Sequence, residues 1–153
     1  MQPTMVEREA FTVMGLTFRG RPSSLDYADI WCNQFGKVEE RLRALSVDKA
    51  YYGLYCQTGE EGVVDMVAGM AVPPGEEPSA GLVKREVPSA TYAVFGCTMG
   101  TIGQTWRAIG ADWLPTSGYE WDPAGVCFEC FPPDSEDKPD SPLSIFVPVV
   151  KRS

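Results

Sequence analysis

The sequence predicts an α+β domain in which a β-α-β-β unit occurs twice, with pseudo-two-fold symmetry, an antiparallel sheet and two helices. Two observations support this fold class. Of the 153 residues, 44% are apolar and 22% are charged, which is typical of one globular domain. Strand-like and helix-like segments also follow one another in the same order in both halves. We therefore expect a single domain over residues 1–153, with halves at about 4–72 and 82–151.

The first half begins with an expected strand over residues 4–19, which is rich in β-branched and aromatic side chains. Ser23 and Asp26 have the spacing of a capping box, and a helix with one apolar stripe is expected from there to about Leu45. Two strands, at 50–56 and 63–72, should pair through a Gly-rich turn.

The second half repeats this order. A short segment at 82–87 leads to a strand at 90–98, and Thr101 with Gln104 should cap the helix that follows. Strands at 126–131 and 143–150 complete the unit. Two such units can pair about a pseudo-two-fold axis, and a ligand is then expected in a central groove between them.

The charge balance and the lack of histidine exclude several classes of function. There are 13 Lys+Arg and 21 Asp+Glu, and 13 − 21 gives a net charge of −8, so we expect no nucleic-acid and no membrane partner. The absence of His removes His-dependent nucleophiles and His-ligated zinc sites. No glycine spacing matches a phosphate-binding loop. We expect neither a metal nor another cofactor.

The cysteines are expected to be buried free thiols in a reducing compartment, and we therefore expect a cytoplasmic protein. Their number is odd and all lie among apolar residues, at Cys32, Cys56, Cys97, Cys127 and Cys130. The last two form a C-x-x-C motif. Residues three apart on a strand point to opposite faces, so a shared metal is not expected.

Glu129 is the candidate binding residue, because its strand is otherwise apolar on both faces. An unpaired buried carboxylate costs several kcal/mol or takes up a proton, and a bound cation relieves that cost. The alternative is that Glu129 faces water from a half-exposed sheet. Asp65, Asp112 and Glu120 are rival carboxylates near the ends of elements.

Aromatic and methionine side chains that should point inward could form a cation–π box around this acid. The candidates are Trp106, Tyr92, Trp31, Phe35, Trp113, Met70, Phe95 and Phe131. The alternative for each of them is an ordinary place in the core.

Several segments resemble the GyrI-like family, also known as the AraC-type effector-binding or Rob/BmrR-like ligand domain. Residues 65–72, DMVAGMAV, resemble its D-x-V-A-G-V-x-V strand, and residues 87–95, VPSATYAVF, resemble V-P-A-x-x-Y-A-x-F. The segment from Trp106 to Glu120 is similar to W-x-x-I-x-x-x-W-L-P-x-S-G-Y. Residues 128–131, FECF, resemble F-E-x-Y, with Phe131 in place of the tyrosine. The resemblance covers nearly the whole chain.

The resemblance implies the duplicated fold and a central aromatic pocket with one buried acid, which maps onto Glu129. Members bind lipophilic, often cationic, drugs and dyes, and many are fused to DNA-binding domains. We expect here a stand-alone module that senses or sequesters such ligands. Two alternatives stay open. One is a hydrolase of strained cyclopropanoid toxins, in which Glu129 acts as the base with Tyr92 or Tyr119. The other is a module that binds a protein partner such as DNA gyrase.

Overall fold

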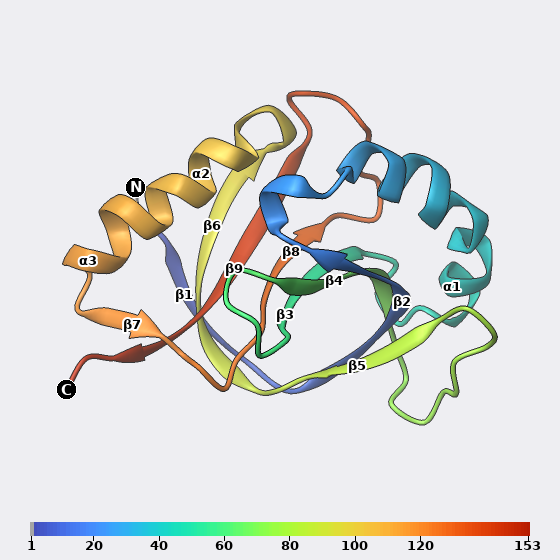
Figure 1. The fold of residues 1–153 in the computed structure, drawn as a ribbon, viewed down its shortest axis with the longest axis horizontal. Coiled ribbons are helices and arrows are strands. Elements are labelled where there is room, and N and C mark those ends of the chain that lie inside the picture. The colour runs from blue at the N-terminus through green and yellow to red at the C-terminus, as the bar shows by residue number, and fades with distance from the viewer. Residues whose placement is uncertain (1) are drawn as a thin grey trace.

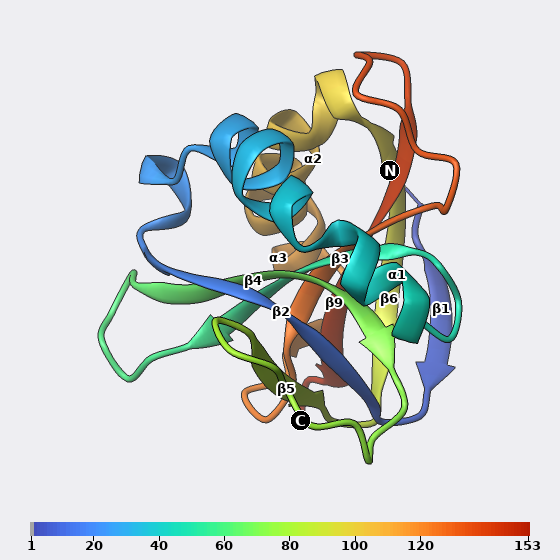
Figure 2. The same cartoon turned by 90° about the vertical axis from the view of Figure 1, so that its right-hand side faces the viewer.

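The computed structural model describes residues 2–153 as an antiparallel nine-stranded open sheet with two helical runs on one of its faces (Figures 1 and 2). This confirms the predicted α+β class. The strands are β1 (Thr4–Arg8), β2 (Phe11–Gly20), β3 (Tyr51–Gln57), β4 (Val64–Val72), β5 (Val83–Val87), β6 (Ala90–Thr98), β7 (Tyr119–Trp121), β8 (Cys127–Phe131) and β9 (Pro142–Lys151).

The strand order shows how the two halves are joined. It runs β1-β6-β9-β8-β3-β4-β2-β5, and β7 pairs separately with β9. The halves meet where β8 pairs with β3. Outward from this junction the order is β9, β6, β1 on one side and β4, β2, β5 on the other. The strands β2, β3 and β4 of the first unit and β6, β8 and β9 of the second therefore occupy equivalent places, whereas β1 and β5 each pair with a strand of the other half.

The prediction of a single strand over residues 4–19 is wrong, because Glu9 and Ala10 interrupt it and divide it into two strands, β1 and β2. β1 pairs with β6 at one edge of the sheet, whereas β2 pairs with β4 and β5 near the other edge. The residue pattern is typical of an extended strand on both sides of this interruption. The two segments differ only in the strands with which they pair. β7 is a further strand that the sequence did not predict.

Each helical run is broken into short turns of different kinds. The first contains η1 (Pro22–Ser24), a π-helical η2 (Asp29–Gln34), η3 (Phe35–Lys37) and α1 (Glu39–Leu45). The second contains η4 (Met99–Thr101), α2 (Ile102–Ala108), a π-helical η5 (Ile109–Trp113) and α3 (Leu114–Thr116). None of the helices in residues 2–153 has the length and apolar character that crossing a membrane requires.

Both predicted capping boxes are replaced by neighbouring caps. The Asp26 carboxylate, rather than Ser23, accepts the backbone N–H of Asp29 at 3.1 Å. Thr98 and Thr101 form the capping box of the second run, three residues earlier than expected. The sequence placed both helical runs correctly and misplaced their first turns.

Three apolar clusters cover the two faces of the sheet. We call the face beneath the helices the helical face. There, one cluster packs Phe35 and Leu42 on strands of the first half, and another packs Ile109 on strands of the second half. The opposite face, which we call the far face, carries a third cluster with Tyr52 and Phe128 but no residue from a helix. The far-face cluster includes residues of both β5 and β6, so the sheet curls around it.

Candidate functional site

Glu129 lies on the helical face of β8, beside the junction of the two halves. It is paired with Gly53 of β3 on one side and with Ile145 of β9 on the other. Only 4% of its surface is exposed. A Cβ atom at Gly53 would lie 3.3 Å from Oε1 of Glu129, so the missing side chain at Gly53 leaves room for the carboxylate.

Two aromatic donors approach the carboxylate. The indole Nε1 of Trp106 donates a hydrogen bond to Oε2 of Glu129 at 2.8 Å. The Tyr55 hydroxyl lies near enough to the same carboxyl group to lower its pKa, and the Tyr27 hydroxyl, which donates to the backbone O of Pro22 at 2.6 Å, lies beside Tyr55. The rings of Tyr55 and Trp106 meet edge to face, with centroids 5.8 Å apart. No Lys or Arg in residues 2–153 forms an ion pair with Glu129.

The pKa of Glu129 reflects this setting. Burial raises it from the ordinary value of 4.5 to about 7, although the hydrogen bond from Trp106 and the nearby Tyr55 hydroxyl lower it. Burial, and next the Glu129 charge, raise the pKa of Tyr55, which keeps that hydroxyl neutral. Near neutral pH the site therefore exchanges easily between a neutral and a negatively charged state.

Trp31 brings the first helical run to this acid. Trp31 belongs to η2, and its ring atom Cζ2 would be 3.5 Å from a Cβ atom at Gly53. It also contacts Phe131 and Phe35, with ring centroids 5.5 and 5.1 Å away. Trp31 packs against both clusters of the helical face. We call the place where Trp31 and Trp106 face Glu129 from the two helical runs the Glu129 seam.

The structure brings some of the predicted site residues together. Trp106 bonds Glu129, Trp31 and Phe131 lie in the Glu129 seam, and Phe35 packs behind Trp31. Met70 is buried on the helical face under the first run. Met66 comes closer to the acid, since its Cε would be 3.3 Å from a Cβ at Gly53.

Other predicted residues lie apart from Glu129. Tyr92 is on the far face, packed on Phe128, and its hydroxyl donates to the backbone O of Pro88 at 3.4 Å. Phe95 is two strands away and packs against Trp113. Tyr119 stacks on Trp113 as well, with ring centroids 6.1 Å apart. We leave these four aromatic residues, Tyr92, Phe95, Trp113 and Tyr119, out of the proposed site.

Tyr55, Tyr27 and Gly53 are site residues that the sequence did not reveal. The alternation in 50–56 places Tyr51, Gly53 and Tyr55 on one face, and that was a usable signal. This alternation does not show that β3 pairs with β8, which comes more than 70 residues later in the chain.

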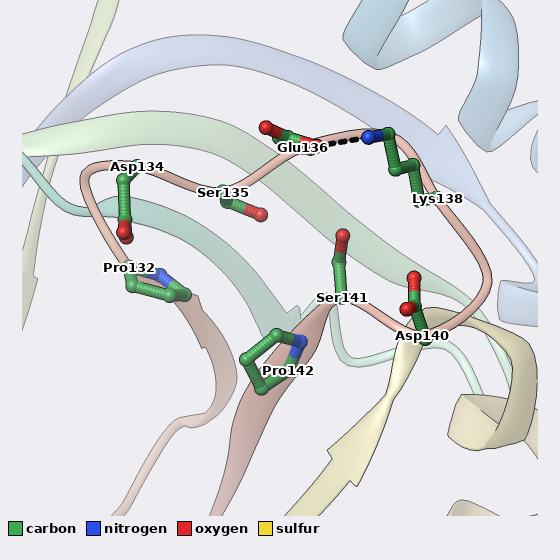
Figure 3. A pocket seen from close by; sticks show the side chains of 8 residues that line it. All are labelled: Pro132, Asp134, Ser135, Glu136, Lys138, Asp140, Ser141 and Pro142. Atoms are coloured by element: carbon green, nitrogen blue, oxygen red, sulfur yellow. Dashed lines mark ion pairs between the residues drawn. The ribbon is translucent and has the colours of Figure 1, made fainter.

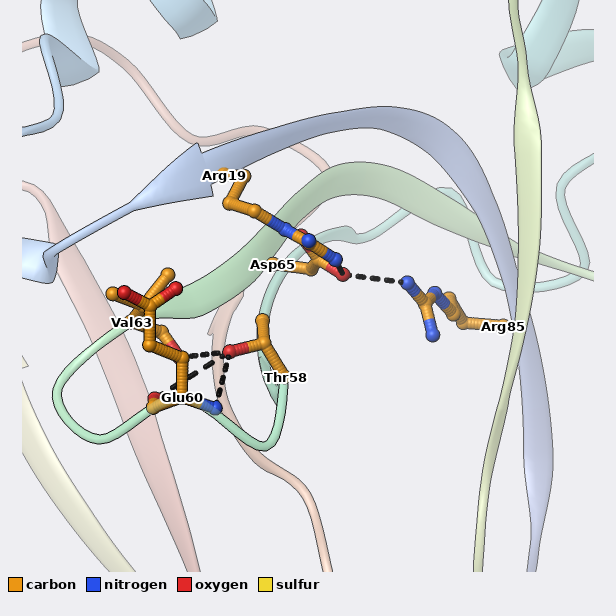
Figure 4. Close-up of polar contacts among 6 residues, drawn as sticks. All are labelled: Arg19, Thr58, Glu60, Val63, Asp65 and Arg85. Atoms are coloured by element: carbon orange, nitrogen blue, oxygen red, sulfur yellow. Dashed lines mark hydrogen bonds and ion pairs between the residues drawn. The ribbon is translucent and has the colours of Figure 1, made fainter.

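The rival carboxylates do not share the environment of Glu129. Asp65 accepts from Nε and Nη2 of Arg19 at 2.8 and 2.9 Å and from Nη2 of Arg85 at 3.1 Å (Figure 4). These bonds, the Arg19 bond above all, lower the pKa of Asp65. Asp112 and Glu120 are exposed. The charge of Asp65 is thus already balanced by two arginine side chains of the same chain.

Two open hollows lie away from the seam. One, of about 320 Å³, is bounded by the polar loop between β8 and β9, where Glu136 and Lys138 form an ion pair (Figure 3). The other, of about 480 Å³, lies beside β1. Glu129 lines neither of them. Its own surroundings are occupied by aromatic rings.

All five cysteines are free. Cys56 and Cys127 are buried, and Cys97 and Cys130 are partly buried. Cys32 is exposed, with Sγ 3.7 Å from Oδ2 of Asp137, so the expectation of burial is wrong for this residue. Among residues 2–153, no group of three or more Cys, Asp or Glu side chains is placed to hold a metal ion.

Comparison with known proteins adds three relatives. The transcriptional regulator BrlR of Pseudomonas aeruginosa is 29% identical in an alignment 153 positions long, gaps included, that covers 97% of this chain and 56% of BrlR. The chain thus spans little more than half of that relative. The structure of SAV2435 bound to tetraphenylphosphonium superposes with a TM-score of 0.79 at 13% identity, covering 98% of this chain and 94% of the other.

The third relative is the C-terminal domain of EcmrR, with a TM-score of 0.72 at 17% identity and coverage of 99% and 98%. At these identities the two solved structures show a shared fold. The family described as GyrI-like small molecule binding domain matches residues 1–150. The resemblance seen in the sequence motifs therefore holds over nearly the full length, and the chain belongs to the GyrI-like family of small-molecule-binding domains.

Proposed function

We propose that this domain binds lipophilic cations at the Glu129 seam, and that it senses or sequesters drug-like molecules of this class. The observation that carries the proposal is a carboxylate that is 4% exposed, surrounded by aromatic rings and without a cationic partner in residues 2–153. A charge in that position is costly unless a counter-charge joins it. The relative SAV2435, which was solved with tetraphenylphosphonium, supports this ligand class.

The aromatic residues of the seam suit such a ligand. Trp31, Trp106 and Tyr55 present ring faces and edges near one carboxylate. Aromatic faces attract cations, and large apolar rings bury the hydrocarbon part of the ligand. Because these rings occupy the seam, a large cation enters by displacing Trp31 or Trp106 from the acid. Both tryptophans are half-buried, so part of each ring remains in contact with solvent.

Proton release should accompany binding. With a pKa of about 7, the free carboxyl is about half protonated at neutral pH, and a cation binds the ionised form. The affinity for a cation should then rise about tenfold between pH 6 and pH 8, because the ionised fraction rises by that factor.

A matched pair of ligands tests the charge. We expect methyltriphenylphosphonium to quench tryptophan fluorescence with a micromolar dissociation constant, roughly −8 kcal/mol, and the neutral triphenylphosphine oxide to bind more weakly. Glu129→Gln should weaken the cation by about 1.5–3 kcal/mol, remove the pH dependence and leave the neutral ligand unaffected. Asp65→Asn is the control, since Asp65 is already paired with Arg19 and Arg85. Equal affinities of both ligands for the parent protein would disprove the proposal.

Hydrolysis is the second candidate, and the Tyr55 hydroxyl beside Glu129 is the observation that favours it. A carboxyl with a pKa of about 7 suits a general base, and Tyr55 could orient a water molecule, in place of the distant Tyr92 and Tyr119. Product formation from a cyclopropanoid substrate, lost in both Glu129→Gln and Tyr55→Phe, would establish it. Slow turnover unaffected by either substitution would exclude this site as the catalyst.

A further inference from the structure

On the far face of the sheet, the side chain of Arg8 from β1 lies among four aromatic rings. Its guanidinium carbon is 4.1 Å from the ring centroid of Phe11, 5.4 Å from those of Tyr52 and Phe128, and 5.5 Å from that of Phe146. All four distances are within the range of a cation–π contact, and a planar guanidinium stacks well on rings. We call these four rings the Arg8 cage.

A polar group completes the cage. Nη2 of Arg8 donates to the Tyr52 hydroxyl at 2.8 Å, and that hydroxyl donates to Oδ2 of Asp48 at 2.6 Å. The carboxylate of Asp48 thus orients the hydroxyl oxygen toward the cation. A guanidinium in the cage therefore finds both aromatic faces and a hydrogen-bond acceptor.

The cage is built by strands other than β1. Phe128 and Phe146 stack in parallel with centroids 4.6 Å apart, and Phe11 packs on both Tyr52 and Phe128. These rings come from β2, β3, β8 and β9, and they contact one another without help from Arg8. The arrangement of rings should consequently survive the removal of the arginine.

β1, in contrast, is held weakly. It is an edge strand of five residues and pairs only with β6. The hollow of about 480 Å³ lies beside Arg8, bounded by residues 7–9 and 89–91. The hollow reaches Arg8 itself, whereas none of the four rings of the cage lines it.

We propose that the Arg8 cage is a second cation-binding site, specific for guanidinium and small alkylammonium groups, which β1 occupies with Arg8 as a tethered ligand. It lies on the opposite face of β8 from Glu129, because Phe128 and Glu129 are consecutive residues of that strand. The two sites are therefore separate, and the cage does not depend on the proposed function of the Glu129 seam.

Because Arg8 is tethered to the domain, it competes strongly with any dissolved cation for the cage. A ligand held by a short piece of chain acts at an effective concentration on the order of millimolar or more. A dissolved guanidinium compound must exceed that concentration to replace Arg8, and doing so frees β1 from one of its anchors. Removal of the arginine should open the cage to the same compound at lower concentration.

The experiment titrates Arg8→Ala with ethylguanidinium chloride and follows the NMR signals of the Tyr52 and Phe128 rings. We expect saturable binding, at least tenfold tighter than in the parent protein. N-ethylurea, which has nearly the same shape without charge, and sodium chloride at equal ionic strength should not produce it. Adding Phe146→Leu removes one wall of the cage and should weaken binding at least fivefold.

Two further measurements keep the proposal testable. Arg8→Met retains the hydrocarbon stem and replaces Arg8→Ala if the alanine variant does not fold. In the parent protein, ethylguanidinium should accelerate hydrogen exchange of the β1 amides more than sodium chloride does. Glu129→Gln should leave cage binding unchanged, which separates this proposal from the previous one. The proposal is overturned if the Arg8 variants bind ethylguanidinium no better than the parent or no better than ethylurea, or if exchange in β1 is unaffected.

Discussion

Glu129 carries a cost in stability, and the binding role that we propose for it would make use of that cost. Its carboxyl has a pKa of about 7 because burial outweighs the hydrogen bond from Trp106 and the effect of the nearby Tyr55 hydroxyl. The protonated form is accordingly favoured in the folded state, while the unfolded chain ionises near its ordinary pKa. An ionised Glu129 is useful only when a cation joins it, and in the empty protein it destabilises the fold.

Stability should therefore fall as pH rises through the region of this titration. The folded pKa lies above the unfolded one, so the contribution of Glu129 is fully present below about pH 4.5 and is lost by about pH 7. The loss amounts to about 3 kcal/mol at 1.36 kcal/mol per pKa unit. Glu129→Gln should remove this decline, measured as the free energy of unfolding in urea at pH 5 and pH 8. Parallel pH profiles for parent and variant would contradict the burial argument.

At the scale of elements, the pairing of β3 with β8 decides where the acid can lie. Gly53 is the residue opposite Glu129, and its lack of a side chain leaves the space that Glu129, Met66 and Trp31 share. The helical runs contribute one tryptophan each, Trp31 from η2 and Trp106 from α2. The site thus requires both halves of the sheet and both helical runs.

Gly53→Ala should narrow this space. The new methyl group would lie 3.3 Å from Oε1 of Glu129 and 3.3 Å from Cε of Met66, both flexible ends of side chains. We expect a small loss of stability, about 1 kcal/mol, and a several-fold weaker affinity for methyltriphenylphosphonium. Gly96→Ala in β6 is the matched control, because a Cβ there meets nothing within 4 Å. It should leave affinity unchanged and stability equal or slightly higher, by thermal unfolding and fluorescence titration.

For the molecule as a whole, the Glu129 seam joins two halves that have separate clusters on the helical face. A ligand bound in the seam as we propose would contact residues from both, so it should stabilise the whole domain as one unit. The net charge of −8 also favours the approach of cations.

A ligand at one hundred times its dissociation constant stabilises a domain by about 2.7 kcal/mol. For a chain of this size, that corresponds to a rise in Tm of roughly 5–10 °C. We expect this shift with methyltriphenylphosphonium at pH 8, a smaller one at pH 6, and little in Glu129→Gln at the same concentration. Differential scanning calorimetry should show one transition that moves as a whole. A transition that splits, with only one part moving, would contradict binding across the two halves.

The sequence by itself determined the α+β class, most strand positions and the place of Glu129 in an apolar strand, because these depend on local patterns of side chains. The motifs also identified the GyrI-like family, which the match over residues 1–150 confirms. Only the tertiary structure decided which residues lie next to Glu129. Tyr92 and Tyr55 both lie on strands of aromatic character, yet only Tyr55 lies next to Glu129, because β3 pairs with β8 and the alternation of side chains places Tyr92 on the far face. The break between β1 and β2, which places Arg8 in its cage, likewise depends on which distant strand each segment pairs with. Such pairing is a choice among long-range partners, and local residue patterns do not encode it.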